Sequence, residues 1–257
     1  MGMVAISLQS GSSGNCWFVE SDGVRVLIDA GLSVRQVRRR LAVYGRAEVP
    51  IDAVFVSHEH ADHIAGVAAY SKHFGAPIYI TPKTWEALCR NRKGLEIATL
   101  THFNPGAAIC VKHLRIETIP TPHDSVDGSA FIVDDGQRRL GVMTDLGHVF
   151  EKLRSAMRTL DGVFIESNYD PRLLASGRYH PALKSRISGG HGHISNVESA
   201  ELLQGAVAER LRWACLCHLS GENNSPELAL ATHREFIGDA LMLSVDSRRS
   251  ATGAFEV

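Results

Sequence analysis

Seven consecutive residues carry the strongest signal in this chain: Ser57-His58-Glu59-His60-Ala61-Asp62-His63. They end a short apolar run, 53–57, that is typical of a buried strand, and they lead into a segment, 62–74, with helical spacing. Two histidines at positions i and i+2 of a turn can face one point, and Asp62 and His63 then come from the first helical turn beside them. Imidazole and carboxylate groups together suit Zn, Mn or Fe. The stretch therefore predicts a metal site.

Three more side chains of the same chemistry stand at the ends of predicted strands. His123 follows the run 116–121, Asp145 follows 140–144, and His218 follows 213–217. A lone His or Asp in such a place is more often a hydrogen-bonded structural residue than a metal ligand. The histidine-rich stretch upstream changes that weighting, because loops at strand ends gather into sites. We expect all three to join the metal site.

The remaining pattern predicts an α/β (α+β) fold. Strands are expected at 4–8, 16–20, 24–28, 53–57, 77–81, within 107–119 (two), and at 130–133, 138–143, 162–166, 213–218, 241–245 and 254–257. Helices are expected at 32–44, 62–74, 82–90, 149–159, 196–209 and 226–239. Two mixed sheets packed together with outer helices account for this order, as one domain over residues 1–257.

The composition excludes several classes of protein. Hydrophobic residues make up 44% of the chain and charged residues 21%, as in ordinary globular proteins, and the net charge of −1 gives no overall basic field. Five scattered cysteines argue against a disulfide framework and for a reducing compartment. The N-terminus lacks a signal-peptide pattern, and no stretch approaches the ~20 apolar residues of a membrane helix. We expect a cytoplasmic protein with no membrane association and no obligate protein partner.

The order of these side chains resembles the metallo-β-lactamase superfamily, whose first motif matches Leu27-Ile28-Asp29-Ala30-Gly31. The resemblance spans nearly the whole chain and implies a four-layer αββα sandwich with the site at one edge of two facing sheets. It also implies two divalent metal ions. By position, the first would be held by His58, His60 and His123 and the second by Asp62, His63 and His218, with Asp145 bridging both and Asp29 orienting a ligand histidine.

Such a centre has a defined chemistry. Two cations ~3.5–4 Å apart lower the pKa of a bridging water, and the resulting hydroxide acts as a nucleophile. Asp62 is a candidate catalytic residue because it could also orient that nucleophile. The ligand set accepts Zn, Mn or Fe, so the sequence leaves the metal open.

Five further blocks resemble the YycJ/WalJ group within this superfamily, in the larger set that includes RNase Z and PhnP. They are Ser10–Asn15, Thr121–Ser125, Glu166–Asp170, Gly192–Asn196 and His218–Asn224. The resemblance implies a phosphodiesterase that acts on DNA as a 5′-to-3′ exonuclease, with single strands as the expected substrate. A small-molecule or cyclic phosphodiesterase similar to PhnP, a thioester or lactone hydrolase, and a metal-retaining binding module without catalysis stay open as alternatives.

The blocks also suggest residues for the substrate. Ser195 and Glu198 form a capping box at the start of a predicted helix, where a phosphate is favoured, and His193 just before it could protonate a leaving oxygen. Alternatively, His193 only helps the turn. Candidate substrate contacts, each of which could instead shape a loop or cap a helix, are Ser13, Asn15, Asn168, Ser195 and Asn223. The basic stretch from His180 to Arg186 either lines a nucleic-acid path or is a solvated face.

Overall fold

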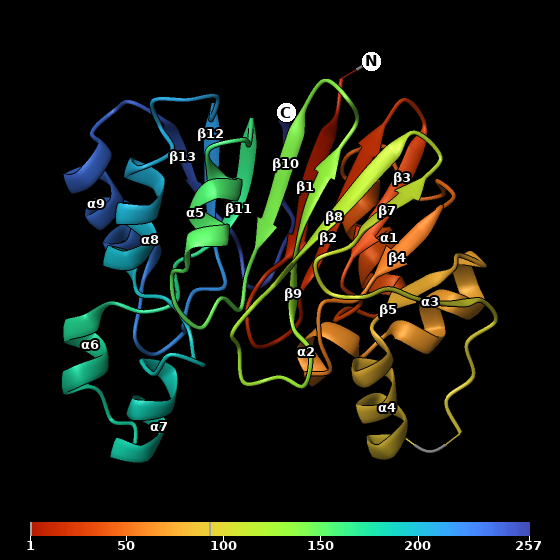
Figure 1. Ribbon diagram of the computed structural model, residues 1–257, viewed down its shortest axis with the longest axis horizontal. Helices are drawn as coiled ribbons and strands as arrows, with labels where there is room; N and C mark the ends of the chain where they lie inside the picture. The colour runs from red at the N-terminus through yellow and green to blue at the C-terminus, as the bar shows by residue number, and fades with distance from the viewer. Residues whose placement is uncertain (1, 93) are drawn as a thin grey trace.

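Two seven-stranded sheets face each other in the computed structural model, which describes residues 2–92 and 94–257 (Figure 1). The first sheet has the order β14-β1-β2-β3-β4-β5-β6. Its strands are β1 (Val4–Gln9), β2 (Cys16–Ser21), β3 (Val24–Ile28), β4 (Ala53–Phe55), β5 (Ile78–Ile80), β6 (Leu100–His102) and β14 (Thr252–Glu256). The strands β3 to β6 run parallel and the others antiparallel, so the sheet is mixed.

The second sheet repeats this plan with the order β13-β12-β11-β10-β9-β8-β7. Its strands are β7 (Ala108–Val111), β8 (Leu114–Pro120), β9 (Ser129–Asp134), β10 (Arg139–Met143), β11 (Gly162–Glu166), β12 (Trp213–Cys217) and β13 (Met242–Val245). Strands β10 to β13 run parallel, and β7 to β10 are antiparallel neighbours. Both mixed sheets match the expected fold class.

Helices cover the outer face of each sheet (Figure 1). The helices of the described residues are α1 (Val34–Ala42), α2 (Ala61–Ile64), α3 (Val67–Phe74), α4 (Pro82–Asn91), α5 (Glu151–Met157), α6 (Pro171–Ser176), α7 (Pro181–Ile187), α8 (Asn196–Gln204) and α9 (Pro226–Ile237). Helices α1, α3 and α4 pack on the first sheet, and α5, α8 and α9 pack on the second. The expected αββα layers are confirmed.

A central apolar core lies between the two sheets. Its largest members come from strands of both: Trp17, Phe55, Phe131, Phe164 and Trp213. All five side chains are almost fully buried, and burying such rings is the main favourable contribution to packing the layers. The core joins the two sheets into one body, while the single domain over 1–257 stays a prediction.

The prediction of one continuous helix over 62–74 is wrong, because the structure has two helices there, α2 and α3, with a break between them. The break falls at Gly66, whose backbone N–H donates to the Ala30 carbonyl at 2.7 Å. A Cβ at this position would lie 2.2 Å from the Leu32 carbonyl oxygen, so the turn needs glycine there. The break lets Asp62 and His63 stay on their own short turn beside the metal-binding loop.

Smaller differences concern element ends and short elements. The expected helix 196–209 stops at Gln204, and the expected strand 254–257 begins and ends earlier, at 252–256. The pattern also missed β6 and the two short helices α6 and α7. Both helices start at a proline after a capping side chain, Asp170 and His180 respectively, which is a usable signal for a helix start. Among the described helices, none has the length and apolarity needed to cross a membrane.

Candidate metal centre

The site lies at the edge where the carboxyl ends of several strands meet. Asp29 follows β3, Asp145 follows β10 by two residues, and His218 follows β12 directly. All three have positive φ angles, of 63°, 55° and 55°, in the left-handed region that non-glycine residues rarely adopt. The chain therefore turns sharply as it leaves each strand, and this turn places the side chain at the edge between the sheets.

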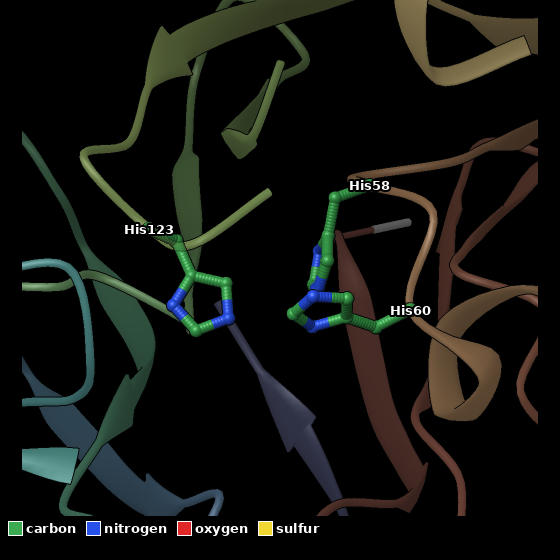
Figure 2. Close-up of side chains that lie close together, drawn as sticks. All are labelled: His58, His60 and His123. Carbon is green, nitrogen blue, oxygen red and sulfur yellow. The ribbon is translucent and has the colours of Figure 1, made fainter. Parts of the chain in front are cut away.

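The first group of side chains is His58, His60 and His123, whose ligand atoms lie within 4.8 Å of one another. His58 and His60 stand on the loop between β4 and α2, and His123 comes from the loop after β8 in the other sheet. Figure 2 shows the three rings converging from these two sides. The first predicted trio is thus brought together across the two sheets.

The second group is Asp62, His63 and His218, within the same distance limit. Asp145 lies between the groups, since it clusters with His58 and His63 and also with His218. Its Oδ2 atom is 3.3 Å from His63 Nε2, and its Oδ1 atom is 3.6 Å from His123 Nε2. All seven positions expected to be ligands therefore converge, with Asp145 central.

The imidazoles are oriented by contacts on their outer side. His63 Nδ1 lies 2.7 Å from Asp29 Oδ2, and the Asp29 carboxylate also accepts from the backbone N–H and hydroxyl of Ser57. His123 Nδ1 donates to the Gly192 carbonyl at 2.8 Å. Contacts of this kind fix the tautomer and leave the other ring nitrogen free to bind a cation.

Unpartnered buried atoms show that the residues fit a metal. In the described part of the chain, the buried atoms His58 Nε2, Asp145 Oδ2 and His218 Nε2 have no hydrogen-bond partner. Leaving such atoms unpaired costs free energy, so they need a ligand that the protein itself does not provide. A divalent cation answers this need, and a donor set of imidazole and carboxylate suits Zn, Mn or Fe.

The protonation states of His58 and Asp145 agree with metal binding, whereas nearby carboxylates outweigh burial and raise the pKa values of His63 and His218, so a cation would displace a proton from each of these two rings. Burial and then the charge of His63 hold the pKa of His58 well below its ordinary value, so its ring is neutral. Burial alone would raise the pKa of Asp145, but the surrounding imidazoles of His218 and His63 lower it well below its usual range. Neutral imidazole and ionised carboxylate are the forms that bind cations.

The sequence matches the Beta-lactamase superfamily domain over residues 24–216. The chain belongs to this superfamily. The exodeoxyribonuclease WalJ of Streptococcus pneumoniae serotype 2 is 34% identical over 227 residues, 88% of this chain and 84% of the relative. The exodeoxyribonuclease YycJ of Bacillus anthracis is 30% identical over 232 residues, 89% of this chain and 87% of the relative. The expected resemblance to the YycJ/WalJ group is confirmed.

Solved structures extend the same conclusion for the superfamily fold. The metallo-β-lactamase fold protein YhfI from Bacillus subtilis superposes with a TM-score of 0.74. The match covers 98% of this chain and 100% of that one, at 17% identity. It supports the fold alone.

Glu166, at the end of β11, is a site residue that the sequence analysis missed. It is fully buried; its Oε1 atom lies 2.5 Å from His193 Nδ1 and 3.5 Å from His218 Nδ1, and its Oε2 atom accepts from the Leu146 N–H at 2.9 Å. Burial raises its pKa, but the charge and hydrogen bond of His193 lower it to about 2. In the sequence, Glu166 could have been recognised as a candidate because it is a carboxylate at the end of a predicted buried strand.

Two of the expected substrate residues lie against the ligands instead of facing an open surface. The Asn15 amide donates to Asp62 Oδ2 at 3.0 Å, and the Asn168 amide donates to the His218 carbonyl at 2.7 Å. Both side chains are buried. Asn168 still lines a pocket beside His193 and His218, so a substrate contact there stays a prediction.

The other three expected substrate residues lie farther out. Ser195 caps α8 through the predicted capping box with Glu198, and Asn223 is buried and bonded to Ser220. The exposed Ser13 hydroxyl accepts from Gln9 at 3.0 Å. These contacts support loops around the superfamily's metal centre, and direct contact with substrate stays a prediction for each.

The basic stretch from His180 to Arg186 forms most of α7. Lys184 Nζ donates to the Ala175 carbonyl of α6 at 2.6 Å, which ties the two helices together. Arg186 Nε lies 2.5 Å from Asp124 Oδ2, directly next to His123. The stretch therefore lies beside the metal centre, at the end of the molecule that also holds α2 (Figure 1).

Proposed function

We propose that this protein is a binuclear metal-dependent phosphodiesterase that acts as a 5′-to-3′ exonuclease on single-stranded DNA. The observation that carries the proposal is the pair of ligand groups, His58-His60-His123 and Asp62-His63-His218, which meet at Asp145. The relatives named exodeoxyribonuclease, at 34% and 30% identity over most of the chain, support DNA as substrate.

The chain's own residues have defined roles in this proposal. Two divalent ions held by the two groups would supply positive charge for the phosphate and an activated water. Asp62, held by the Asn15 amide, orients the attacking water. His193, paired through Nδ1 with Glu166, keeps Nε2 available to give a proton to the leaving oxygen. Both residues are therefore proposed as catalytic.

The compartment and the metals belong to the same proposal. All five cysteines are unpaired, which fits the reducing conditions of the cytoplasm. Zn, Mn and Fe all suit the ligand set, so activity assays with each metal identify the one that supports turnover.

End-labelled single strands test the proposal. Protein loaded with Mn or Zn should shorten 5′-labelled and 3′-labelled oligonucleotides, releasing the 5′ label at once and shortening the 3′-labelled strand stepwise. A chelator should stop the reaction, and Asp145→Asn should lose both bound metal and turnover. Intact strands of several lengths with every metal would contradict the proposal.

A second candidate, a small-molecule phosphodiesterase, is favoured by one observation. The pocket beside His193 has a volume of ≈ 230 Å³, which is smaller than the roughly 300–1,000 Å³ of pockets for drug-sized ligands and so favours a small substrate. Turnover of bis(p-nitrophenyl) phosphate in the presence of DNA oligomers separates the two candidates. Competitive inhibition by DNA supports the nuclease, and its absence supports the small diester.

A further inference from the structure

A pocket of ≈ 230 Å³ opens directly beside the metal centre. Its walls come from five separate segments of the chain, and include Ser12, Asn168, Tyr179, His193, His218 and Arg248. His193 and His218 belong to the centre already described. Ser12, Tyr179 and Arg248 have no role in holding metal, so they point to something else bound next to it.

Arg248 is a half-buried cation without an acidic partner. Its Nη2 atom donates to Ser12 Oγ at 2.9 Å, and no carboxylate of the described residues lies within ion-pairing distance. Glu222 also lines the pocket but is exposed and forms no such pair. The guanidinium thus keeps N–H groups for an anion, and phosphate is the anion whose geometry it matches best.

The position of Arg248 is fixed by neighbouring glycines. A Cβ at Gly221 would lie 1.8 Å from Arg248 Nη1, and one at Gly11 would lie 3.4 Å from its Cγ. The side chain therefore lies close to the backbone of two loops, at Gly11 and at Gly221. Such confinement lowers the entropy lost when the guanidinium binds a ligand.

Another part of the pocket wall belongs to a basic segment, which contributes Tyr179, Ile187 and His193. Residues 171–197 hold Arg172, Arg178, Lys184 and Arg186 and contain no Asp or Glu, in a chain whose net charge is −1. Arg172 and Arg178 are exposed. Tyr179, next to Arg178, lines the pocket itself. Positive charge along a path with an aromatic ring beside it is the pattern that binds single-stranded nucleic acid.

We propose that this pocket binds the nucleotide next to the phosphate being cleaved, with Arg248 binding that nucleotide's other phosphate and Tyr179 stacking on its base. The proposal rests on the proposed function and adds the residues that hold the strand. That other phosphate is either a terminal monoester or an internal diester, which share one chemistry. Cleavage of DNA then depends on a second phosphate that a simple diester lacks.

The test compares Arg248→Gln with Arg212→Gln, a matched control. Arg212 is exposed just before β12, whereas the site follows the other end of that strand. For Arg248→Gln, KM for a single-stranded oligonucleotide should rise roughly 10- to 100-fold, as expected for a lost charge-assisted phosphate contact. The value of kcat should change far less. The loss on bis(p-nitrophenyl) phosphate should be much smaller than the loss on DNA.

A second variant keeps the charge but moves it. Gly221→Ala should displace the flexible guanidinium without unfolding the loop, and should raise KM as Arg248→Gln does. Anisotropy of a labelled strand with chelator-treated protein gives the same comparison without turnover. With 5′-phosphorylated and 5′-hydroxyl strands, an effect confined to the former assigns the terminal monoester, and an equal effect assigns the internal diester.

The outcomes are distinct. If wild-type protein degrades DNA and Arg248→Gln has the same KM and strand affinity as Arg212→Gln, this inference is wrong and the proposed function stands. If wild-type protein with metal leaves DNA intact, both are overturned.

Discussion

Three histidines of the candidate metal centre are held on their outer side by neighbouring residues. Outer contacts to Asp29, Gly192 and Glu166 fix the rings of His63, His123 and His218 before any cation arrives. The site is therefore preorganised, and its metal affinity depends on residues that do not touch the metal.

Glu166→Gln tests this dependence. The change removes the negative charge that faces His193 and His218 but keeps an oxygen for the Leu146 N–H. We expect metal affinity to fall about 10- to 100-fold with the fold intact, measured by competition with a chromogenic chelator. Glu198→Gln is the matched control, because Glu198 only caps α8; equal affinities in both variants would show that Glu166 does not support the centre.

Gly31→Ala tests the close packing behind the centre. A Cβ at Gly31 would lie 1.8 Å from the Asp62 carbonyl oxygen and 2.5 Å from the Asn15 nitrogen, both rigid backbone atoms. We expect a loss of about 1–3 kcal/mol in the free energy of unfolding, together with weaker metal binding, because Asp62 must move. Urea titration measures the first effect. Gly205→Ala, whose Cβ would approach nothing closer than 3.6 Å, should leave both quantities unchanged.

That the seven candidate ligands lie close together could be predicted from the resemblance to the superfamily, because each of them stands at a strand end or in the turn from His58 to His63. Glu166 was missed, because a carboxylate at the end of a strand does not by itself indicate that its oxygens face His193 and His218. Asn15 was predicted to meet substrate, yet its amide lies on Asp62. The spacing of residues along the sequence does not show which side chains from distant segments form hydrogen bonds with each other.

Helices α8 and α9 meet around a buried histidine. His233 Nδ1 donates to the Ala229 carbonyl at 2.8 Å, and Nε2 accepts from the Ser199 hydroxyl at 3.1 Å. Burial lowers its pKa from 6.5 to about 4, although the bond to Ala229 acts in the other direction. The folded protein therefore needs the neutral ring.

This histidine predicts a pH dependence of stability. As pH falls below about 6.5, His233 becomes protonated in the unfolded chain, whereas in the folded chain it stays neutral until the pH is near 4. Its contribution is complete above pH 6.5 and is lost as pH falls through this window, by up to about 3 kcal/mol. Between pH 7 and pH 4, the free energy of unfolding should fall by about 3 kcal/mol more in wild type than in His233→Gln.

Asp246 changes the stability with pH in the opposite direction, so its contribution must be separated from that of His233. Burial raises its pKa from 3.8 to about 6, so its contribution is present at low pH and is lost as pH rises through that range. The wild-type slope alone therefore understates His233, which is why the difference between the two proteins is the measurement. Parallel curves would mean that His233 does not titrate as proposed.

Most elements could be predicted because their apolar periodicity was regular. The helix break at Gly66 could not, since it depends on contact with Ala30 and Leu32, far from it in sequence. Helix α7 has no buried residue and hence no apolar stripe to detect. An apolar pattern in the sequence indicates which residues of one element are buried. The helix break at Gly66 depends instead on contacts with distant residues, and α7 lacks buried residues altogether.

The two sheets are joined at the C-terminal end of the described chain. The chain passes from β13 in the second sheet to β14, which pairs antiparallel with β1 in the first. Phe255 of β14 stacks on Trp213 of β12, with ring centroids 4.4 Å apart, and the Trp213 indole N–H donates to the Glu256 carbonyl at 3.0 Å. This contact is a connection between the layers that the sequence order alone did not reveal.

Phe255→Ala tests that connection. Removing the ring takes away the stacking partner of Trp213 and one of the aromatic contacts of Phe164. We expect the free energy of unfolding to fall by about 2 kcal/mol, since the ring is partly exposed. Val43→Ala, at a side chain that is 77% exposed, is the control and should change little; equal midpoints in urea would contradict the role of Phe255.

The pairing of β1 with β14 also determines when the first sheet can be completed during synthesis. Among the described strands, β1 emerges from the ribosome first and β14 last. Until then, β1 presents an open edge that neighbouring chains can pair with, so the nascent protein passes through an aggregation-prone stage. Closure joins residues separated by almost the full described length, which makes it a slow, late step of folding.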